Sequence, residues 1–134
     1  MAFKFLEHTA DVLFEAENIS FEKALEDAAA ALSVTVAESV EKQEEFEFTE
    51  TAENIEELVV ATLSRFLVET EIRQMLPGGL TVLSLQEAPG NFVVKVSAWA
   101  GIGKQKTIVK GVTYGMLQVV RGPEKCKIRV LLDI

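Results

Sequence analysis

Only two stretches of this chain repeat apolar residues at the three- and four-residue spacing of an amphipathic helix, and both lie within residues 1–71. The first spans residues 21–36 and follows Ser20, a residue type that favours the N-cap position. The second begins at residue 55 and is expected to end near residue 70, with Asn54 and Glu57 spaced as in a capping box. The rest of the chain must therefore form strands and turns.

Residues outside these two stretches show the alternation or the short apolar runs of β-strands. We expect strands at residues 3–6, 12–16, 45–50, 81–86, 92–100, 114–120 and 127–134. The predicted order is β-β-α-β-α-β-β-β-β. Strands joined by short turns favour antiparallel pairing, so the predicted fold class is α+β, with antiparallel β-sheets and two packed amphipathic helices. The same order argues against a doubly wound nucleotide-binding fold.

Two glycine-containing segments are expected to interrupt the strands. Pro77-Gly78-Gly79 should break the chain before the strand at 81–86. Gly101-Ile102-Gly103 resembles a phosphate-binding loop only superficially, because it opens no helix and lacks the third glycine and the Lys-Ser/Thr pair. We therefore expect it to be a turn.

The composition is that of one domain, residues 1–134, with enough apolar residues (49%) for a core. The formal net charge of −8 disfavours a basic nucleic-acid binder. Residues 1–71 hold 4 Lys/Arg and 18 Asp/Glu, whereas residues 72–134 hold 9 and 3, so the two parts carry −14 and +6. Either two faces meet different partners, or the two parts neutralise each other in the fold.

The sequence also limits location and redox chemistry. A single cysteine, Cys126, excludes an internal disulfide and a multi-cysteine metal site, and we expect it on a strand near a turn. No apolar run approaches the roughly 20 residues of a membrane span. The N-terminus shows no signal-peptide pattern, so the expected location is the cytoplasm.

One short polar loop, His8-Thr9-Ala10-Asp11, holds the only histidine and lies between two predicted strands. Loops on rigid scaffolds are where binding sites concentrate, although a lone histidine or aspartate is commonly a hydrogen-bonded structural residue. At the other end of the chain, Asp133 is the only acidic residue after Glu124. If Asp133 lies near Asp11, these carboxylates and a terminal or backbone oxygen form an all-oxygen cluster that suits Ca²⁺, Mg²⁺ or Mn²⁺. No spacing rule brings the two residues together.

Four segments carry a family resemblance. They are His8-Thr9-Ala10-Asp11, the acidic amphipathic helix with Phe21 and Ala24, Lys110-Gly111-Val112-Thr113-Tyr114, and Leu132-Asp133-Ile134. Together they resemble the archease family, and the resemblance covers essentially the whole chain. The first and last segments are specific in combination, whereas either alone would be weak.

The resemblance implies a small α+β accessory protein that is not an enzyme. Archeases are known chiefly as cofactors of the GTP-dependent tRNA-splicing RNA ligase of the RtcB type, in which they promote guanylylation and multiple turnover. Some have been proposed as chaperone-like modulators of a tRNA methyltransferase. The implied partner is therefore an RNA ligase active in tRNA splicing or RNA repair. We expect the protein itself neither to bind nucleic acid strongly nor to associate with a membrane.

The resemblance also implies a site. The family binds a divalent cation, seen as calcium, and the matching ligands here are Asp11, Asp133 and a backbone oxygen of Ile134. Glu7, His8 and Thr9 would shape the loop. No catalytic residue is implied.

Three lysines are candidate contacts to a partner, and two positions differ from the pattern of the family. Lys104, Lys106 and Lys110 are candidates to meet phosphate or an acidic partner surface, with a solvated sheet edge as an equal alternative. Gly115 stands where the family usually has a histidine, so no role of that histidine carries over. Glu7 stands where the family often has Asp, which is a mild change.

Two other functions remain open on sequence alone. A metal-dependent phosphoester hydrolase would use Asp11, Asp133 and His8, with metal-bound water as the nucleophile. A chaperone-like module for a tRNA-modifying enzyme would use the acidic first half to mimic RNA and cover a basic surface.

Overall fold

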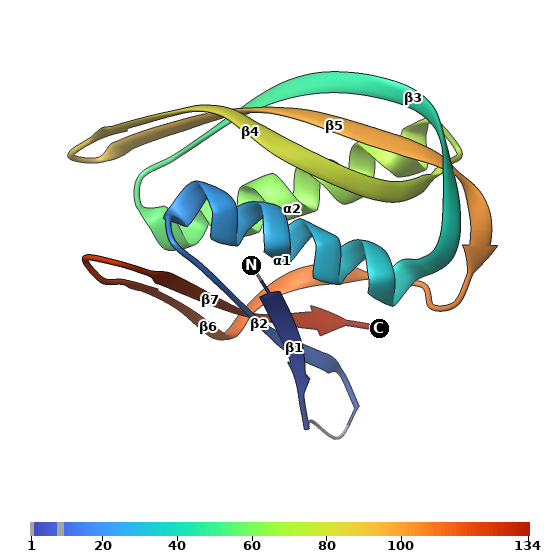
Figure 1. Ribbon diagram of the computed structural model, residues 1–134, viewed down its shortest axis with the longest axis horizontal. Helices are drawn as coiled ribbons and strands as arrows, with labels where there is room; N and C mark the ends of the chain where they lie inside the picture. The colour runs from blue at the N-terminus through green and yellow to red at the C-terminus, as the bar shows by residue number, and fades with distance from the viewer. Residues whose placement is uncertain (1, 8–9) are drawn as a thin grey trace.

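The two helices lie between two antiparallel sheets, which gives the molecule three layers (Figure 1). The computed structural model describes residues 2–7 and 10–134. Seven strands and two helices follow one another in the order β-β-α-β-α-β-β-β-β over these residues. The predicted α+β class and the predicted order of elements are therefore confirmed.

The two sheets divide the chain unequally. Sheet A has the order β1-β2-β7-β6 and joins both ends of the chain. Sheet B has the order β3-β5-β4 and uses only residues 37–105. The strands are β1 (Ala2–Leu6), β2 (Val12–Asn18), β3 (Ala37–Ala52), β4 (Leu76–Ala88), β5 (Asn91–Gln105), β6 (Gly111–Arg121) and β7 (Cys126–Asp133).

Both helices begin at the predicted caps. Helix α1 (Phe21–Val36) follows Ser20, whose Oγ accepts a hydrogen bond from the Lys23 backbone N–H at 3.2 Å. Helix α2 (Ile55–Ile72) follows Asn54, whose Oδ1 accepts from the Glu57 backbone N–H at 2.8 Å. Helix α2 ends at Ile72, just beyond the predicted end near residue 70.

Helix α1 is buried on most of its surface because a sheet covers it on each side (Figure 1). Its alanines make this possible, since small side chains let strands approach a helix closely. Ala24, Ala28, Ala29 and Ala31 are fully buried, as are the large side chains Leu25 and Leu32. The core therefore lies between the helices and the faces of the two sheets that pack on them.

The Pro77-Gly78-Gly79 prediction was wrong, because these residues lie inside β4 and do not precede it. The register between β4 and β5 shifts at Pro77–Gly79, and the Trp99 ring of β5 lies against both glycines. A Cβ at Gly78 would overlap the indole ring. The glycines thus make room for a tryptophan within the sheet.

Gly101-Ile102-Gly103 is likewise no turn, because it continues β5. Strand β3 opposes this segment with two register shifts, between Glu38 and Glu41 and between Lys42 and Glu44. A Cβ at Gly101 would overlap the backbone carbonyl oxygen of Glu41. Close approach of two backbones at a bulge explains the glycine.

Strand β6 begins at Gly111, earlier than predicted, and carries an irregularity in its middle. Its register with β7 shifts between Thr113 and Gln118, and Met116 adopts a left-handed φ of 58°. The Arg129 Nε–H donates to the Met116 carbonyl at 3.0 Å and holds the bulge. Gly115, the departure from the family pattern, lies in this exposed bulge.

The charge asymmetry is partly neutralised within the fold. Four cations from the second half pair with carboxylates of the first half: Arg73 with Glu44, Lys95 with Glu47, Lys104 with Glu38 and Lys125 with Glu17. Most of these groups are exposed, so each pair contributes little to stability. Cys126 begins β7 and is buried, as expected for a small residue near a turn, and its burial raises the pKa of the thiol.

One ion-pair network ties α2 to β3. Glu69 accepts from Arg65 Nε at 2.6 Å and from Arg73 Nη1 at 2.7 Å. The same arginines reach Glu50 and Glu44 of β3. Hydrogen bonds from Arg65 and Arg73, more than their charges, lower the pKa of Glu69 below its ordinary value.

This network predicts a loss of stability in acid. Above the unfolded-state pKa of Glu69 the paired carboxylate stabilises the fold, and that stabilisation disappears as the pH falls through the lower folded-state pKa. The free energy of unfolding should therefore fall as the pH drops below the ordinary range of a glutamate pKa. Urea denaturation over this range should show a shallower fall for Glu69→Gln.

The control is Glu71→Gln, which changes an exposed carboxylate of the same helix that forms no ion pair with any described residue. It should keep the slope of the unmodified protein. The same slope for Glu69→Gln would contradict the assignment of the acid sensitivity to the network.

Candidate functional site

Asp11 and Asp133 flank the last residue pair at one end of sheet A. Strands β2 and β7 pair in antiparallel register, and Val12 opposite Leu132 is the last pair at this end. Asp11 immediately precedes Val12, and Asp133 immediately follows Leu132. The register supplies the proximity that no sequence spacing predicted, because it joins residues from the two ends of the chain.

The two carboxylates have no ionic partner among residues 2–7 and 10–134, and neither accepts a hydrogen bond there. Asp11 is half-buried, whereas Asp133 and Ile134 are exposed, so solvent reaches all three. The main chain of Asp133 is anchored, because the Lys110 backbone N–H donates to its carbonyl at 2.7 Å. This bond fixes the end of β7 against the start of β6.

The donors at this end fit a hard cation. Two carboxylates and the main-chain oxygens of Ile134 offer oxygen only, which favours Ca²⁺, Mg²⁺ or Mn²⁺ over zinc. Across the part of the chain that the structure describes, no three His, Cys, Asp or Glu side chains gather as a metal site. A cation here would therefore depend on backbone oxygen and water in addition to the two aspartates.

The structure places the other predicted residues unevenly. Glu7 is exposed just after β1, and His8 and Thr9 lie outside the described residues. Lys104 lies near the C-terminal end of β5 and pairs with Glu38 at 3.7 Å. Lys106 and Lys110 belong to the connection from β5 to β6, which passes the Asp11–Asp133 end.

Asp11 lines an open pocket of about 430 Å³ that sequence reasoning missed. Its walls include Phe5 of β1, Val34 and Thr35 of α1, and Lys106. The backbone N–H of Lys106 donates to the Val36 carbonyl at 2.7 Å and holds this connection against the end of α1. Tertiary packing alone brings these segments together, so no local pattern could have predicted the pocket.

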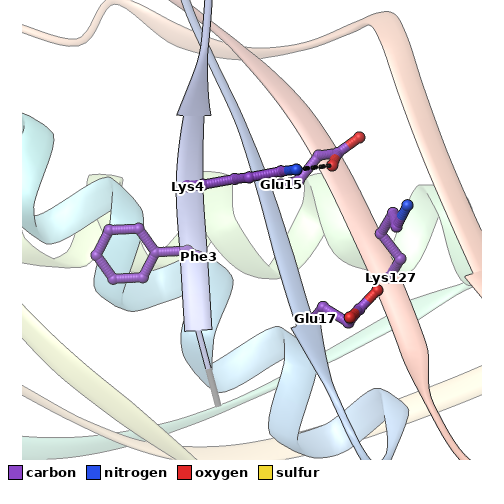
Figure 2. Close-up of a pocket in the computed structure, with 5 residues that line it drawn as sticks. All are labelled: Phe3, Lys4, Glu15, Glu17 and Lys127. Carbon is purple, nitrogen blue, oxygen red and sulfur yellow. Dashed lines mark ion pairs between the residues drawn. The ribbon is translucent and has the colours of Figure 1, made fainter.

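Another pocket, on β1, β2 and β7, is not a candidate. It has a volume of about 190 Å³ and is lined by Phe3, Lys4, Glu15, Glu17 and Lys127. Figure 2 shows Lys4 directed toward Glu15, its ion-pair partner at 3.8 Å, while Phe3 points to the opposite side of β1. The two lysines and two glutamates that line it carry no net charge, so the pocket favours neither an anionic nor a cationic ligand.

Comparison with known proteins identifies the family. The model of the Archease protein family (MTH1598/TM1083) matches residues 3–134. The protein archease of Methanosarcina mazei is 29% identical over 98% of this chain and 95% of its own length. That of Methanosarcina acetivorans is 28% identical over the same shares.

Solved structures of similar fold agree with this family match. The solution structure of Methanobacterium thermoautotrophicum protein 1598 superposes with a TM-score of 0.83, at 24% identity and 98% coverage of both chains. The crystal structure of an archease from Thermotoga maritima, described as a possible chaperone, gives 0.62 at 25% identity and covers 98% of this chain and 96% of that one. Within the described residues, neither helix is long and apolar enough to cross a membrane. The chain belongs to the archease family.

Proposed function

We propose that this protein binds a divalent cation through Asp11, Asp133 and Ile134 and activates a GTP-dependent RNA ligase of the RtcB type. Family membership supports an accessory role. The description of the Thermotoga maritima relative as a possible chaperone also points to action on another protein. In this role the protein promotes ligase guanylylation and performs no chemistry of its own.

The observation that carries the proposal is the Val12–Leu132 pair at the end of the β2–β7 ladder, which brings the neighbouring residues Asp11 and Asp133 to the same end of sheet A. Carboxylates that are brought together repel unless a cation joins them, and neither Asp11 nor Asp133 is neutralised by a described cationic side chain. Ca²⁺ takes roughly six to eight oxygen ligands. Two aspartates and Ile134 supply only part of that set, so water or a partner supplies the rest.

The chain's own residues set the geometry. The Val12–Leu132 pair fixes the backbone next to Asp11 and Asp133, and the Lys110 backbone N–H keeps the end of β7 in place. A bound cation would supply positive charge near the nucleotide site of the ligase, where nucleotidyl transfer depends on positioning and charge neutralisation. The cytoplasm is the proposed location.

The test is a guanylylation assay of purified ligase with metal-stripped protein, at a fixed concentration of the ligase's own metal ion. Guanylylation should rise when Ca²⁺ is added back, over the concentration range in which calorimetry detects Ca²⁺ binding to the protein. No stimulation at any Ca²⁺, Mg²⁺ or Mn²⁺ concentration would contradict the proposal.

A chaperone-like modulator of a tRNA methyltransferase is the second candidate. The description of the Thermotoga maritima relative favours it. Strand β3 also carries exposed carboxylates that a basic partner could contact: Glu41, and Glu44, Glu45 and Glu47, which pair with Arg73, Lys42 and Lys95 in the fold. Light scattering of the methyltransferase on heating distinguishes the two. Suppression of aggregation that a chelator leaves unchanged would favour this candidate over the cation-dependent role.

A further inference from the structure

A second hollow adjoins the pocket that contains Asp11. It has a volume of about 410 Å³ and lies between the end of α1, the start of β3 and the Trp99 side of sheet B. Val34 and Lys106 line both hollows, so the two meet at these side chains. We call the combined depression, from Trp99 past Val34 and Lys106 to Asp11, the Val34 groove.

Exposed apolar side chains gather along the Val34 groove. Val34 is 43% exposed and Phe5 is 48% exposed, and both line the half that contains Asp11. Ile108, which follows the lining residue Thr107, is 69% exposed. Large apolar side chains left in solvent beside a hollow are typical of a protein-binding surface.

The charge in the groove specifies the partner further. Lys106 forms no ion pair with any described residue, whereas Lys104, two positions earlier, pairs with Glu38. The Lys106 ammonium therefore remains available at the point where the two hollows meet. A carboxylate of a partner is the group that complements it.

We propose that the Val34 groove receives an extended segment of the partner ligase that carries a bulky apolar side chain next to a carboxylate. The apolar side chain packs beside Val34 and Phe5, and the carboxylate pairs with Lys106. This placement brings the segment alongside Asp11 and Asp133. The inference rests on the proposed function and names the surface through which it operates.

The walls favour a protein segment over a polynucleotide. Phosphate backbones are bound through several lysines or arginines, because each phosphate carries a charge. Lys106 is the single cationic side chain that lines the groove among the described residues. The groove also contains Asp11 and Glu38, and Glu38 pairs with Lys104. Lys106 is thus the one lining cation, which suits one carboxylate, and the exposed Val34 and Phe5 suit an apolar anchor.

The test measures binding of the purified ligase by calorimetry, in saturating Ca²⁺, for Val34→Glu and Lys106→Glu. Each substitution should weaken binding at least about tenfold, the loss of one central interface contact. Ca²⁺ binding by each variant alone should be unchanged. Val68→Glu is the matched control, because Val68 is 48% exposed on α2 and lines neither hollow. It should bind within about twofold of the unmodified protein.

The outcomes separate the two proposals. Equal affinity for Val34→Glu, Lys106→Glu and Val68→Glu would overturn the groove while leaving the cation role intact. Unmodified protein that binds the ligase without stimulating it would overturn the proposed function alone. No binding at all would overturn both. Circular dichroism measures whether each variant is folded. If Val34→Glu disturbs α1, Lys106→Glu still tests the groove, because Lys106 lies outside any helix or strand.

Nucleotide binding is the competing outcome. Trp99 is the only tryptophan of the chain, so its fluorescence reports on the groove without interference. GTP added to the protein alone, with Ca²⁺, should leave this fluorescence unchanged. Saturable quenching by GTP that Lys106→Glu abolishes would overturn the peptide assignment in favour of a nucleotide site.

Discussion

Asp11→Asn or Asp133→Asn should reduce ligase guanylylation to the rate of the ligase alone. Each substitution removes one of two anionic ligands at the end of the β2–β7 ladder, and the remaining carboxylate with backbone oxygen is a poor site for Ca²⁺. The fold should persist, because neither side chain contributes an ion pair or hydrogen bond within the described part of the chain. Calorimetry with Ca²⁺ and the guanylylation assay measure the two effects in parallel.

Glu124→Gln is the matched control for this prediction. Glu124 is an exposed carboxylate in the turn between β6 and β7, at the opposite end of β7 from Asp133. It should bind Ca²⁺ and stimulate the ligase as the unmodified protein does. Full stimulation by both aspartate variants would rule out the cation-centred role, whereas loss in all three variants would point to net charge instead of a site.

Gly101→Ala should lower the free energy of unfolding by about 3 kcal/mol, at the upper end of what overpacking costs. The added methyl group would overlap the Glu41 carbonyl, which is backbone and cannot rotate away. Strand β3 must then move off β5 at the bulge between Lys42 and Glu44. Urea denaturation followed by circular dichroism measures the change.

Gly111→Ala provides the comparison, because it makes the same chemical change at a strand glycine with no heavy atom within 4 Å of the added Cβ. Its free energy of unfolding should change by less than about 0.5 kcal/mol. Neither glycine has a positive φ, so the contrast isolates packing from backbone conformation. Equal effects of the two substitutions would show that close approach at Gly101 is not what the fold requires.

Local sequence patterns predicted the helix starts and the buried face of β5, because these features depend on interactions between residues close in the sequence. Ser20 and Asn54 marked the helix starts because a capping side chain bonds to backbone N–H groups only three residues away. Val94, Val96 and Ala98 alternate with exposed or half-buried residues, and all three are buried in β5 as that alternation predicts. These features depend on neighbours within one turn or one strand.

The two turn predictions failed because each of these glycines is required by a residue that is distant in the sequence. Gly78 accommodates Trp99 and Gly101 accommodates the Glu41 backbone, so both glycines belong to strand interiors even though glycine usually marks turns. The candidate site shows the same limit. Asp11 was identified by its loop and by the family resemblance, but its proximity to Asp133 follows from the β2–β7 register, and the Val34 groove follows from packing of α1.

The arrangement of sheet A has a consequence for how the protein folds. Sheet B and α2 form from consecutive segments, whereas β2 and β7 pair residues from opposite ends of the chain. Contacts between distant segments carry the larger loop-closure cost and form late. A cation bound between Asp11 and Asp133 would link β2 to β7, the strands that we expect to pair last. Its binding energy would slow the separation of these strands and make the rate of unfolding depend on Ca²⁺.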